Sequence, residues 1–194
     1  LSSSTPTALP DGGVLYGAMT YYNGFRGHLF KFDALGAFLA SYPFGWDSTP
    51  AVYPHGVTYS IVIKDNHYGT SGLYCFRNDP ICQPLTSGPF YITQLNAGLN
   101  IEWQFRNTTI DAANPNGYEW CINAPAIDSA GVVYVNGEDG YVYAIDQGHS
   151  GVFTTPLHKR FLKLAIGAAY TPLSIGPDGR IYTQNDGHLF VLGN

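Results

Sequence analysis

The chain has 194 residues, of which 12% are charged and 15% are aromatic, with 23 glycines and 13 prolines. Such a chain is typical of β-strands joined by tight turns, and its length suits one domain, 1–194, with its own core. The formal net charge of −5 gives no basic surface for nucleic acid or anionic lipid, and no apolar run approaches the ~20 residues of a membrane span. We therefore expect neither nucleic acid nor a membrane span. Because the chain starts at Leu1 without Met, we interpret it as a processed product or an excerpt.

One three-strand unit recurs along the chain. It opens with an entry strand that contains a proline, continues with a glycine-led aliphatic strand, and closes with a second glycine-led strand that carries an aromatic residue. In the first unit these parts are residues 5–9, 13–16 and 27–33. The clearest copy is 124–146, where two strands alternate at period two around a turn of Asn, Gly and Asp residues.

The entry-strand prolines at positions 6, 50, 125 and 172 are separated by 44, 75 and 47 residues. A period in the forties with several strands per unit is typical of β-propeller blades. We therefore predict an all-β fold, a β-propeller of four-stranded antiparallel blades at approximately 5–48, 49–123, 124–170 and 171–194. The long second unit is assigned a third strand at 72–76, an insertion at 78–100 and a long loop at 106–123.

The fourth, outer strands of the blades are predicted at 37–44, 101–105 and 160–166. The last unit stops after its third strand, so the count is about 3.5–4 blades, and we expect a partial ring within a 7–8-bladed propeller. An open half-ring leaves sheet faces and edges uncovered. The remaining blades are therefore expected from a second chain or from the rest of the precursor.

The third unit carries a family resemblance. Its segments Pro125-Ala126-Ile127, Gly131-Val132-Val133-Tyr134-Val135 and Asp139-Gly140-Tyr141-Val142-Tyr143-Ala144-Ile145-Asp146 resemble the repeat of the quinoprotein-dehydrogenase-like (PQQ-like, BamB-like) propellers, a family that includes plant secreted proteins. The segment 100–105, which contains Trp103, resembles the outer strand of that repeat. The resemblance implies a propeller and leaves the function open, because this fold hosts enzymes, scaffolds and binders alike.

Enzymatic members of that family carry a Thr-Gly-x-x-x-Trp docking pattern, a vicinal cysteine pair and acidic or amide ligands for calcium. Here Ala144-Ile145-Asp146 is followed by Gln147-Gly148-His149, without Thr-Gly, and no two cysteines are adjacent. The departures from the family pattern therefore predict no PQQ, calcium or other metal on these blades, and no cofactor.

Three cysteines and one sequon bear on the compartment. Cys75 and Cys82 flank a turn sequence and could close a small disulfide loop; Cys121 is then the odd one, and could pair with a cysteine outside this chain. Asn107 begins an Asn-Thr-Thr glycosylation sequon in a polar loop. These features favour a secreted protein or another oxidising compartment. The alternative is three buried thiols in a cytosolic protein.

The links between blades, and the turns between second and third strands, gather on one face of a propeller. On that face we predict a ligand- or partner-binding site made of Trp46, Trp120, Tyr170, Tyr22, Arg26 and Lys64. Aromatic surfaces beside a few polar groups are what binding sites offer. The alternative for the two tryptophans is that they wedge between blades. Candidate acid–base residues are Glu119, Asp47 and His67.

Two functions are consistent with these patterns. The first is a non-catalytic binding or scaffold propeller that presents an aromatic-rich loop face to a small molecule, a glycan or a protein. The second is a propeller enzyme, either a divergent quinoprotein oxidoreductase or a cofactor-free enzyme, with its site in the central channel and partly on blades outside this chain. The missing cofactor motifs favour the first.

Overall fold

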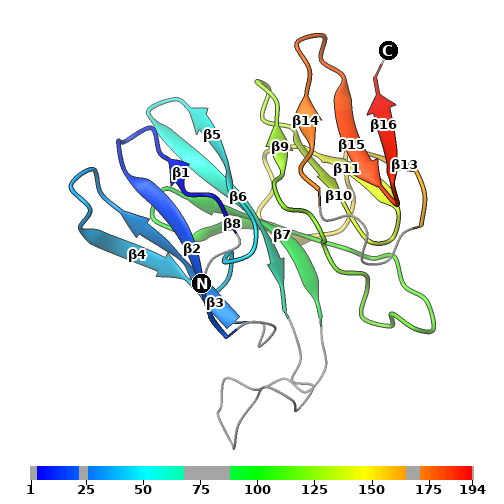
Figure 1. Ribbon diagram of the computed structural model, residues 1–194, viewed down its shortest axis with the longest axis horizontal. Helices are drawn as coiled ribbons and strands as arrows, with labels where there is room; N and C mark the ends of the chain where they lie inside the picture. The colour runs from blue at the N-terminus through cyan, green and yellow to red at the C-terminus, as the bar shows by residue number, and fades with distance from the viewer. Residues whose placement is uncertain (1–3, 22–25, 68–87, 165–170, 194) are drawn as a thin grey trace, which may run out of the picture.

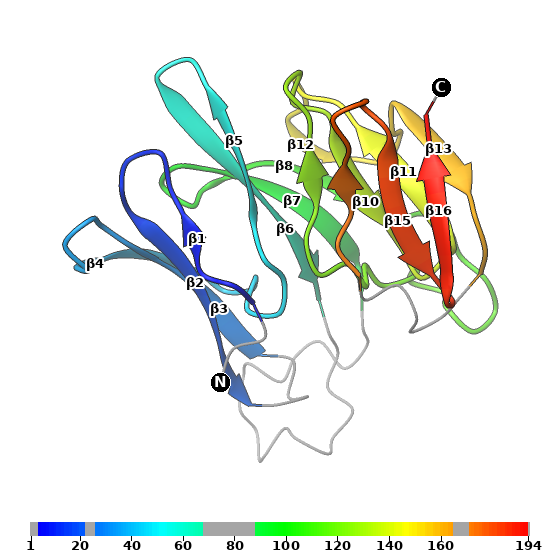
Figure 2. The ribbon, with the colours of Figure 1, turned by 45° about the horizontal axis from the view of Figure 1, so that its top comes forward.

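The computed structural model describes residues 4–21, 26–67, 88–164 and 171–193, and this part of the chain folds into sixteen β-strands without a helix. The strands form four sheets that fan out in chain order (Figures 1 and 2). Blade 1 contains β1 Thr7–Ala8, β2 Val14–Tyr21, β3 Arg26–Phe32 and β4 Phe38–Tyr42. Blade 2 contains β5 Ala51–His55, β6 Thr58–Asn66, β7 Phe90–Asn96 and β8 Ile101–Arg106. Blade 3 contains β9 Ala126–Ile127, β10 Val133–Asn136, β11 Tyr141–Ile145 and β13 His158–Phe161. Blade 4 contains β14 Ser174–Ile175, β15 Ile181–Asn185 and β16 His188–Leu192.

A common turn sets the register of three blades. It joins the first strand to the second, and its glycine has positive φ in each case: 83° at Gly12, 87° at Gly131 and 78° at Gly179. In each turn this glycine donates its N–H to the carbonyl oxygen three residues earlier. Because a side chain is strained at such φ values, glycine is the residue that the turn requires. The shared geometry makes the three glycines equivalent positions, which allows the blades to be compared residue by residue.

The core lies between blades, because the two inner sheets bury side chains on both faces. Strand β6 shows this through its alternation. Ile61 and Ile63 belong to the cluster that joins blades 1 and 2, together with Leu15 and Leu29, whereas Val62 belongs to the cluster that joins blade 2 to blades 3 and 4. Near the inner side of the fan, β9 lies against both β5 and β14. Blade 2 is therefore stabilised by neighbours on both of its faces.

The strand pattern agrees with most of the sequence-based assignment. The outer strands predicted at 37–44 and 101–105 are confirmed as β4 and β8, and the third unit forms β9, β10 and β11 as expected. The outer strand of blade 3 is shifted from the predicted 160–166, because β13 His158–Phe161 pairs with β11. In the described part of blade 4, three strands form the sheet.

The insertion in blade 2 was predicted at the wrong place. Residues 90–96, inside the predicted insertion 78–100, form β7, the strand that lies between β6 and β8. The added residues therefore fall between Asn66 and Phe90. Strand β7 is preceded by Gly88, as β11 is by Gly140, and its Phe90 and Ile92 bury their side chains at period two. The strand predicted at 72–76 lies outside the described residues.

An unpredicted strand ties blades 2 and 3 together. After β11 the chain leaves blade 3, forms β12 Gly151–Phe153 parallel to β8, and returns as β13. Phe153 packs against Trp103 and Phe105 of blade 2. The outer edge of blade 2 is thereby covered by a fifth strand, which removes an exposed edge. No helix in the described residues is long and apolar enough to cross a membrane.

Candidate functional site

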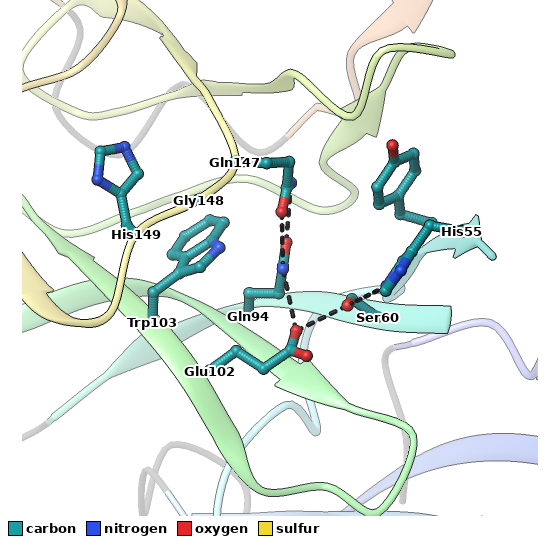
Figure 3. Close-up of a pocket in the computed structure, with 9 residues that line it drawn as sticks. His55, Ser60, Gln94, Glu102, Trp103, Gln147, Gly148 and His149 are labelled. Carbon is teal, nitrogen blue, oxygen red and sulfur yellow. Dashed lines mark hydrogen bonds between the residues drawn. The ribbon is translucent and has the colours of Figure 1, made fainter. Parts of the chain in front are cut away.

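A polar hollow of about 380 Å³ opens between blade 2 and the segment of blade 3 that follows β11 (Figure 3). It is lined by Tyr53, His55, Ser60, Gln94, Glu102, Trp103, Gln147, Gly148 and His149. We call it the inter-blade pocket. Its volume lies within the range of about 300–1,000 Å³ that ligand sites occupy. The lining has no lysine or arginine and one carboxylate.

A reciprocal amide pair joins the two blades inside the inter-blade pocket. Gln94 Nε2 donates to Gln147 Oε1 at 2.8 Å, and Gln147 Nε2 donates back to Gln94 Oε1 at 3.0 Å. Gln147 also donates to the carbonyl oxygen of Gly131 at 2.7 Å, and Gln94 to Glu102 Oε2 at 3.0 Å. Both amides are thus held in one orientation across the blade boundary (Figure 3), so the wall of the pocket is preorganised.

A second chain of hydrogen bonds runs through His55, Ser60 and Glu102. Ser60 Oγ donates to Glu102 Oε2 at 2.7 Å and lies 2.9 Å from His55 Nε2. A serine hydroxyl has one proton, and the carboxylate accepts it, so His55 Nε2 must be the donor and Nδ1 of the neutral ring carries the lone pair. In a hydrolase the histidine instead accepts the serine proton. Ser60 is therefore not an activated nucleophile in this arrangement.

Aromatic rings frame the inter-blade pocket on two sides. The rings of Tyr53 and His55 stack at 5.2 Å on one side, and His149 stacks on Phe153 at 3.7 Å on the other. The ring of His149 is also held by its Nε2 atom, 2.9 Å from Asp146 Oδ1, and this hydrogen bond lowers the pKa of the Asp146 carboxyl. Such flat surfaces beside fixed polar groups suit a ligand with both apolar faces and hydroxyl groups.

The predicted site residues Asp47 and Lys64 form a buried ion pair. Lys64 Nζ lies 3.0 Å from Asp47 Oδ2, and both side chains are largely removed from solvent. Burial raises the pKa of the Asp47 carboxyl, while the charge of Lys64 opposes that shift. Because the ammonium of Lys64 is inside the protein, it does not offer a surface charge to a ligand. The pair fixes the link between blades 1 and 2 to β6.

His67 is held by Asp65, the buried acid that precedes it by two residues. His67 Nε2 lies 3.3 Å from Asp65 Oδ1, and this hydrogen bond raises the pKa of the imidazole. The other oxygen of Asp65 accepts hydrogen bonds from Tyr42, Thr93 and Gln104. Asp65 therefore joins the outer strand of blade 1 to three strands of blade 2, and His67 is the exposed end of that network.

Trp46 and Trp120 are buried, which corrects the prediction that they form an exposed binding surface. The Trp46 ring closes over Gly27, where an added Cβ would lie 2.5 Å from its Cγ atom. Trp120 packs between Phe105 of blade 2 and Tyr143 of blade 3. Both indoles fill the space between blades, which is the alternative that the sequence left open, so neither offers a free ring face to a ligand.

Glu119 lines a different hollow of about 310 Å³, with Asn114, Gly117 and Glu138 among its walls. Glu138 Oε1 accepts a hydrogen bond from Cys121 Sγ at 2.8 Å, and Cys121 is 0% exposed. In the folded chain this thiol cannot reach a cysteine of another chain. The three candidate acid–base residues thus lie in three separate settings, and the structure does not bring them into one site.

Asn107, the predicted glycosylation site, is buried in the folded chain. Asn107 is 1% exposed, its Oδ1 accepts the N–H of Thr109 at 2.9 Å, and its Nδ2 atom is buried. A glycan on that nitrogen would have to pass through packed protein. Tyr22, Tyr170, Cys75 and Cys82 lie outside the described residues, as does the side chain of Arg26, whose backbone opens β3.

The residues of the inter-blade pocket were missed because they come from four separate segments of the sequence. One signal was present: the polar Gln94 shares its face of β7 with the apolar Phe90 and Ile92, and Glu102 lies next to Trp103 in β8. Within the described residues, no group of three or more His, Cys, Asp or Glu side chains could hold a metal ion.

Comparison with known proteins places the fold but no family. No protein-family model matches the chain, and no curated protein matches it. Among solved structures it is similar to a protein of unknown function from Bacteroides caccae (TM-score 0.56, 13% identity, 98% of this chain and 56% of that chain). It is also similar to the Dos1 propeller (0.54, 18%, 92% and 39%) and to the C-terminal WD40 domain of Sif2 (0.53, 13%, 98% and 46%).

These likenesses, with the four fanned sheets, define the chain as a β-propeller, as predicted. It spans about half the length of the solved structures that it matches. The PQQ-like repeat family in particular stays a prediction from the sequence, because the matches are too distant to show more than the fold.

Proposed function

We propose that this chain is a non-catalytic binding propeller whose inter-blade pocket takes a neutral polyhydroxylated ligand of sugar size. The observation that carries the proposal is the pair Gln94 and Gln147, a buried and a half-buried amide that hydrogen-bond to each other across a blade boundary beside one carboxylate. The N–H groups of both amides are already used, so the amide oxygens and the Glu102 carboxylate remain to accept hydrogen bonds from ligand hydroxyl groups without distorting the protein. The absence of a cation from the lining disfavours anionic ligands.

The directions of the hydrogen bonds in the inter-blade pocket support a role in binding rather than in catalysis. The Ser60 hydroxyl donates its hydrogen bond to Glu102 Oε2, and the other Glu102 oxygen, Oε1, accepts no hydrogen bond within the described residues. A ligand hydroxyl can donate to that oxygen, and a second hydroxyl can donate to the lone pair of His55 Nδ1. The rings of Tyr53 and His149 then offer apolar contact to the C–H face of the ligand.

The proposal is tested by titrating the protein with neutral methyl glycosides and polyols while following side-chain amide signals by NMR. We expect the amide signals of Gln94 and Gln147 to shift, and Glu102→Ala to weaken binding by about 10–100-fold, since a hydrogen bond to a charged group contributes about 1.5–3 kcal/mol. Tyr53→Phe, which removes only the hydroxyl, should weaken binding less while keeping the fold.

The matched control is Glu119→Ala, which removes a carboxylate from the separate 310 Å³ hollow and should leave the titration unchanged. A glucuronate, whose carboxylate would face Glu102, should bind more weakly than its neutral counterpart. The proposal would be contradicted if the NMR signals of Gln94 and Gln147 did not shift, or if Glu102→Ala and Glu119→Ala lost the same affinity.

A further inference from the structure

Equivalent positions of the repeat are buried inside the fan and exposed at its end. Starting from the shared turn glycines and the strand registers, Leu29 of blade 1 corresponds to Val142 of blade 3 and to Leu189 of blade 4. Leu29 is 0% exposed and Val142 is 4% exposed, because blades 2 and 4 cover them, whereas Leu189 is 65% exposed. The neighbouring Val191 is exposed too. Blade 4 therefore presents, without a cover, the face with which blades 1 and 3 contact the next blade.

Blade 1 leaves its opposite face exposed, the face that points toward a preceding blade. Val14 of blade 1 corresponds to Val133 of blade 3 and to Ile181 of blade 4. Val133 and Ile181 pack against the preceding blade and are 0% and 7% exposed, whereas Val14 is 37% exposed. On the same face of blade 1, the ring of Phe38 packs edge to face against the rings of Phe30 and Phe32. Blade 1 therefore presents, without a cover, the face that contacts a preceding blade.

The two uncovered faces are the two halves of one kind of interface. They lie at opposite ends of the fan (Figure 2), and neither carries Asp, Glu, Lys or Arg at the positions compared: Leu189 and Val191 on blade 4, and Val14, Tyr16, Phe30 and Phe32 on blade 1. In a lone chain both faces leave apolar side chains exposed to solvent at positions that the other blades bury.

We propose that a second copy of this chain covers both faces, with blade 4 of each copy packed against blade 1 of the other. In this dimer, blade 4 of each copy would contact blade 1 of the other copy in the same way as each blade contacts the next within the chain. Head-to-tail interfaces generate a closed assembly when their rotation closes, and two copies of a four-bladed half would close as an eight-bladed ring. Because the chain spans about half of the propellers that it resembles, two copies supply the blades of one whole ring.

The assembly is tested by sedimentation equilibrium of the full chain. We expect a species of twice 21.1 kDa, and Leu189→Glu or Val14→Glu should each convert it to a monomer by placing a charge in an apolar interface. Leu35→Glu and Val57→Glu, at fully exposed turn positions, are the controls and should leave the dimer intact.

A mixing experiment separates the head-to-tail arrangement from other dimers. A Leu189→Glu chain keeps a native blade 1 face, and a Val14→Glu chain keeps a native blade 4 face, so a mixture of these two monomers should form a heterodimer through one intact interface. A dimer that joined two blade 4 faces or two blade 1 faces would not be rescued by mixing. A wild-type chain that is monomeric at 100 µM (about the upper end of such measurements), or that forms open chains of more than two copies, would overturn the proposal.

Discussion

Asn66 and Trp120, which are 54 residues apart, are joined by two hydrogen bonds between one side chain and one backbone unit. Asn66 Nδ2 donates to the carbonyl oxygen of Trp120 at 3.1 Å, and Asn66 Oδ1 accepts the N–H of Trp120 at 3.2 Å. The amide thus acts as a short piece of β-ladder between the end of β6 and the link that leads to blade 3. Because both partners are buried, the pair decides where Trp120 enters the space between blades.

We expect Asn66→Ala to lower the free energy of unfolding by about 2–4 kcal/mol, because it leaves a buried N–H and a buried carbonyl without these partners. The measurement is the urea midpoint followed by tryptophan fluorescence. Asn100→Ala, which removes an amide from an exposed turn, is the control and should change stability by less than about 0.5 kcal/mol. Equal midpoints for the two variants would show that the Asn66 pair contributes nothing.

Removing one partner of the buried ion pair between Asp47 and Lys64 should strongly destabilise the fold. Lys64→Met leaves the Asp47 carboxylate buried without its countercharge, and we expect a loss of about 3–5 kcal/mol at pH 7. The pKa of Asp47, which burial already raises, rises further in this variant. Protonation then relieves the unpaired charge, so the deficit should shrink as the pH is lowered from 7 toward 5.

Chemical denaturation at several pH values measures this effect. The matched control is Lys163→Met, which removes one member of the half-exposed pair between Lys163 and Asp186 and should cost less than about 1 kcal/mol. A deficit in Lys64→Met that does not depend on pH would contradict the assignment of Asp47 as the titrating group.

Asp11 should control part of the acid stability. The hydrogen bond from Tyr59, and after it the hydrogen bond and charge of Lys31, lower the pKa of the Asp11 carboxyl to about 2, against the opposing effect of burial. A lowered pKa stabilises the fold above the unfolded value of ~3.9, and this contribution is lost as the pH falls toward 2.

The free energy of unfolding of Asp11→Asn should therefore fall less between pH 4 and 2 than that of the wild type. The measurement is a smaller decrease in the urea midpoint over this pH range. Since Asp11 is partly exposed, solvent screening keeps the effect modest. Asp178→Asn changes the equivalent turn carboxylate of blade 4, which lies 3.5 Å from Arg180 Nη1, and should not flatten the curve. The same slope in all three proteins would exclude a special role for Asp11.

The thiol of Cys121 should not react with alkylating reagents in the folded chain. It is buried and its thiol donates to Glu138, so a reagent can reach it only after local or global unfolding. Peptide mass mapping after iodoacetamide treatment should find Cys121 unmodified in buffer and modified in denaturant. Rapid labelling in buffer, or a disulfide from Cys121 to another molecule, would contradict its placement between blades 2 and 3.

Much of the fold was readable from the sequence because its physical causes are local. Alternation at period two, turn glycines such as Gly131, and the recurring entry prolines specify strands and their order without knowledge of the neighbouring blade. The same local rules failed where the chain departs from its repeat. Strand β7 follows an inserted stretch that breaks the repeat period, although Gly88 precedes it. Strand β12 pairs in parallel with a strand of another blade, which no local pattern predicts.

What the sequence by itself determined was therefore the blade: its strands, its turns and the period that makes four of them a propeller. The tertiary structure decided what each side chain faces, because in this fold burial is created by the next blade and not by the strand itself. That is why Trp46, Trp120 and Asn107, which the sequence placed on a surface, are buried. It is also why the inter-blade pocket, assembled by Gln94 from one blade and Gln147 from the next, could be seen only once the blades were packed.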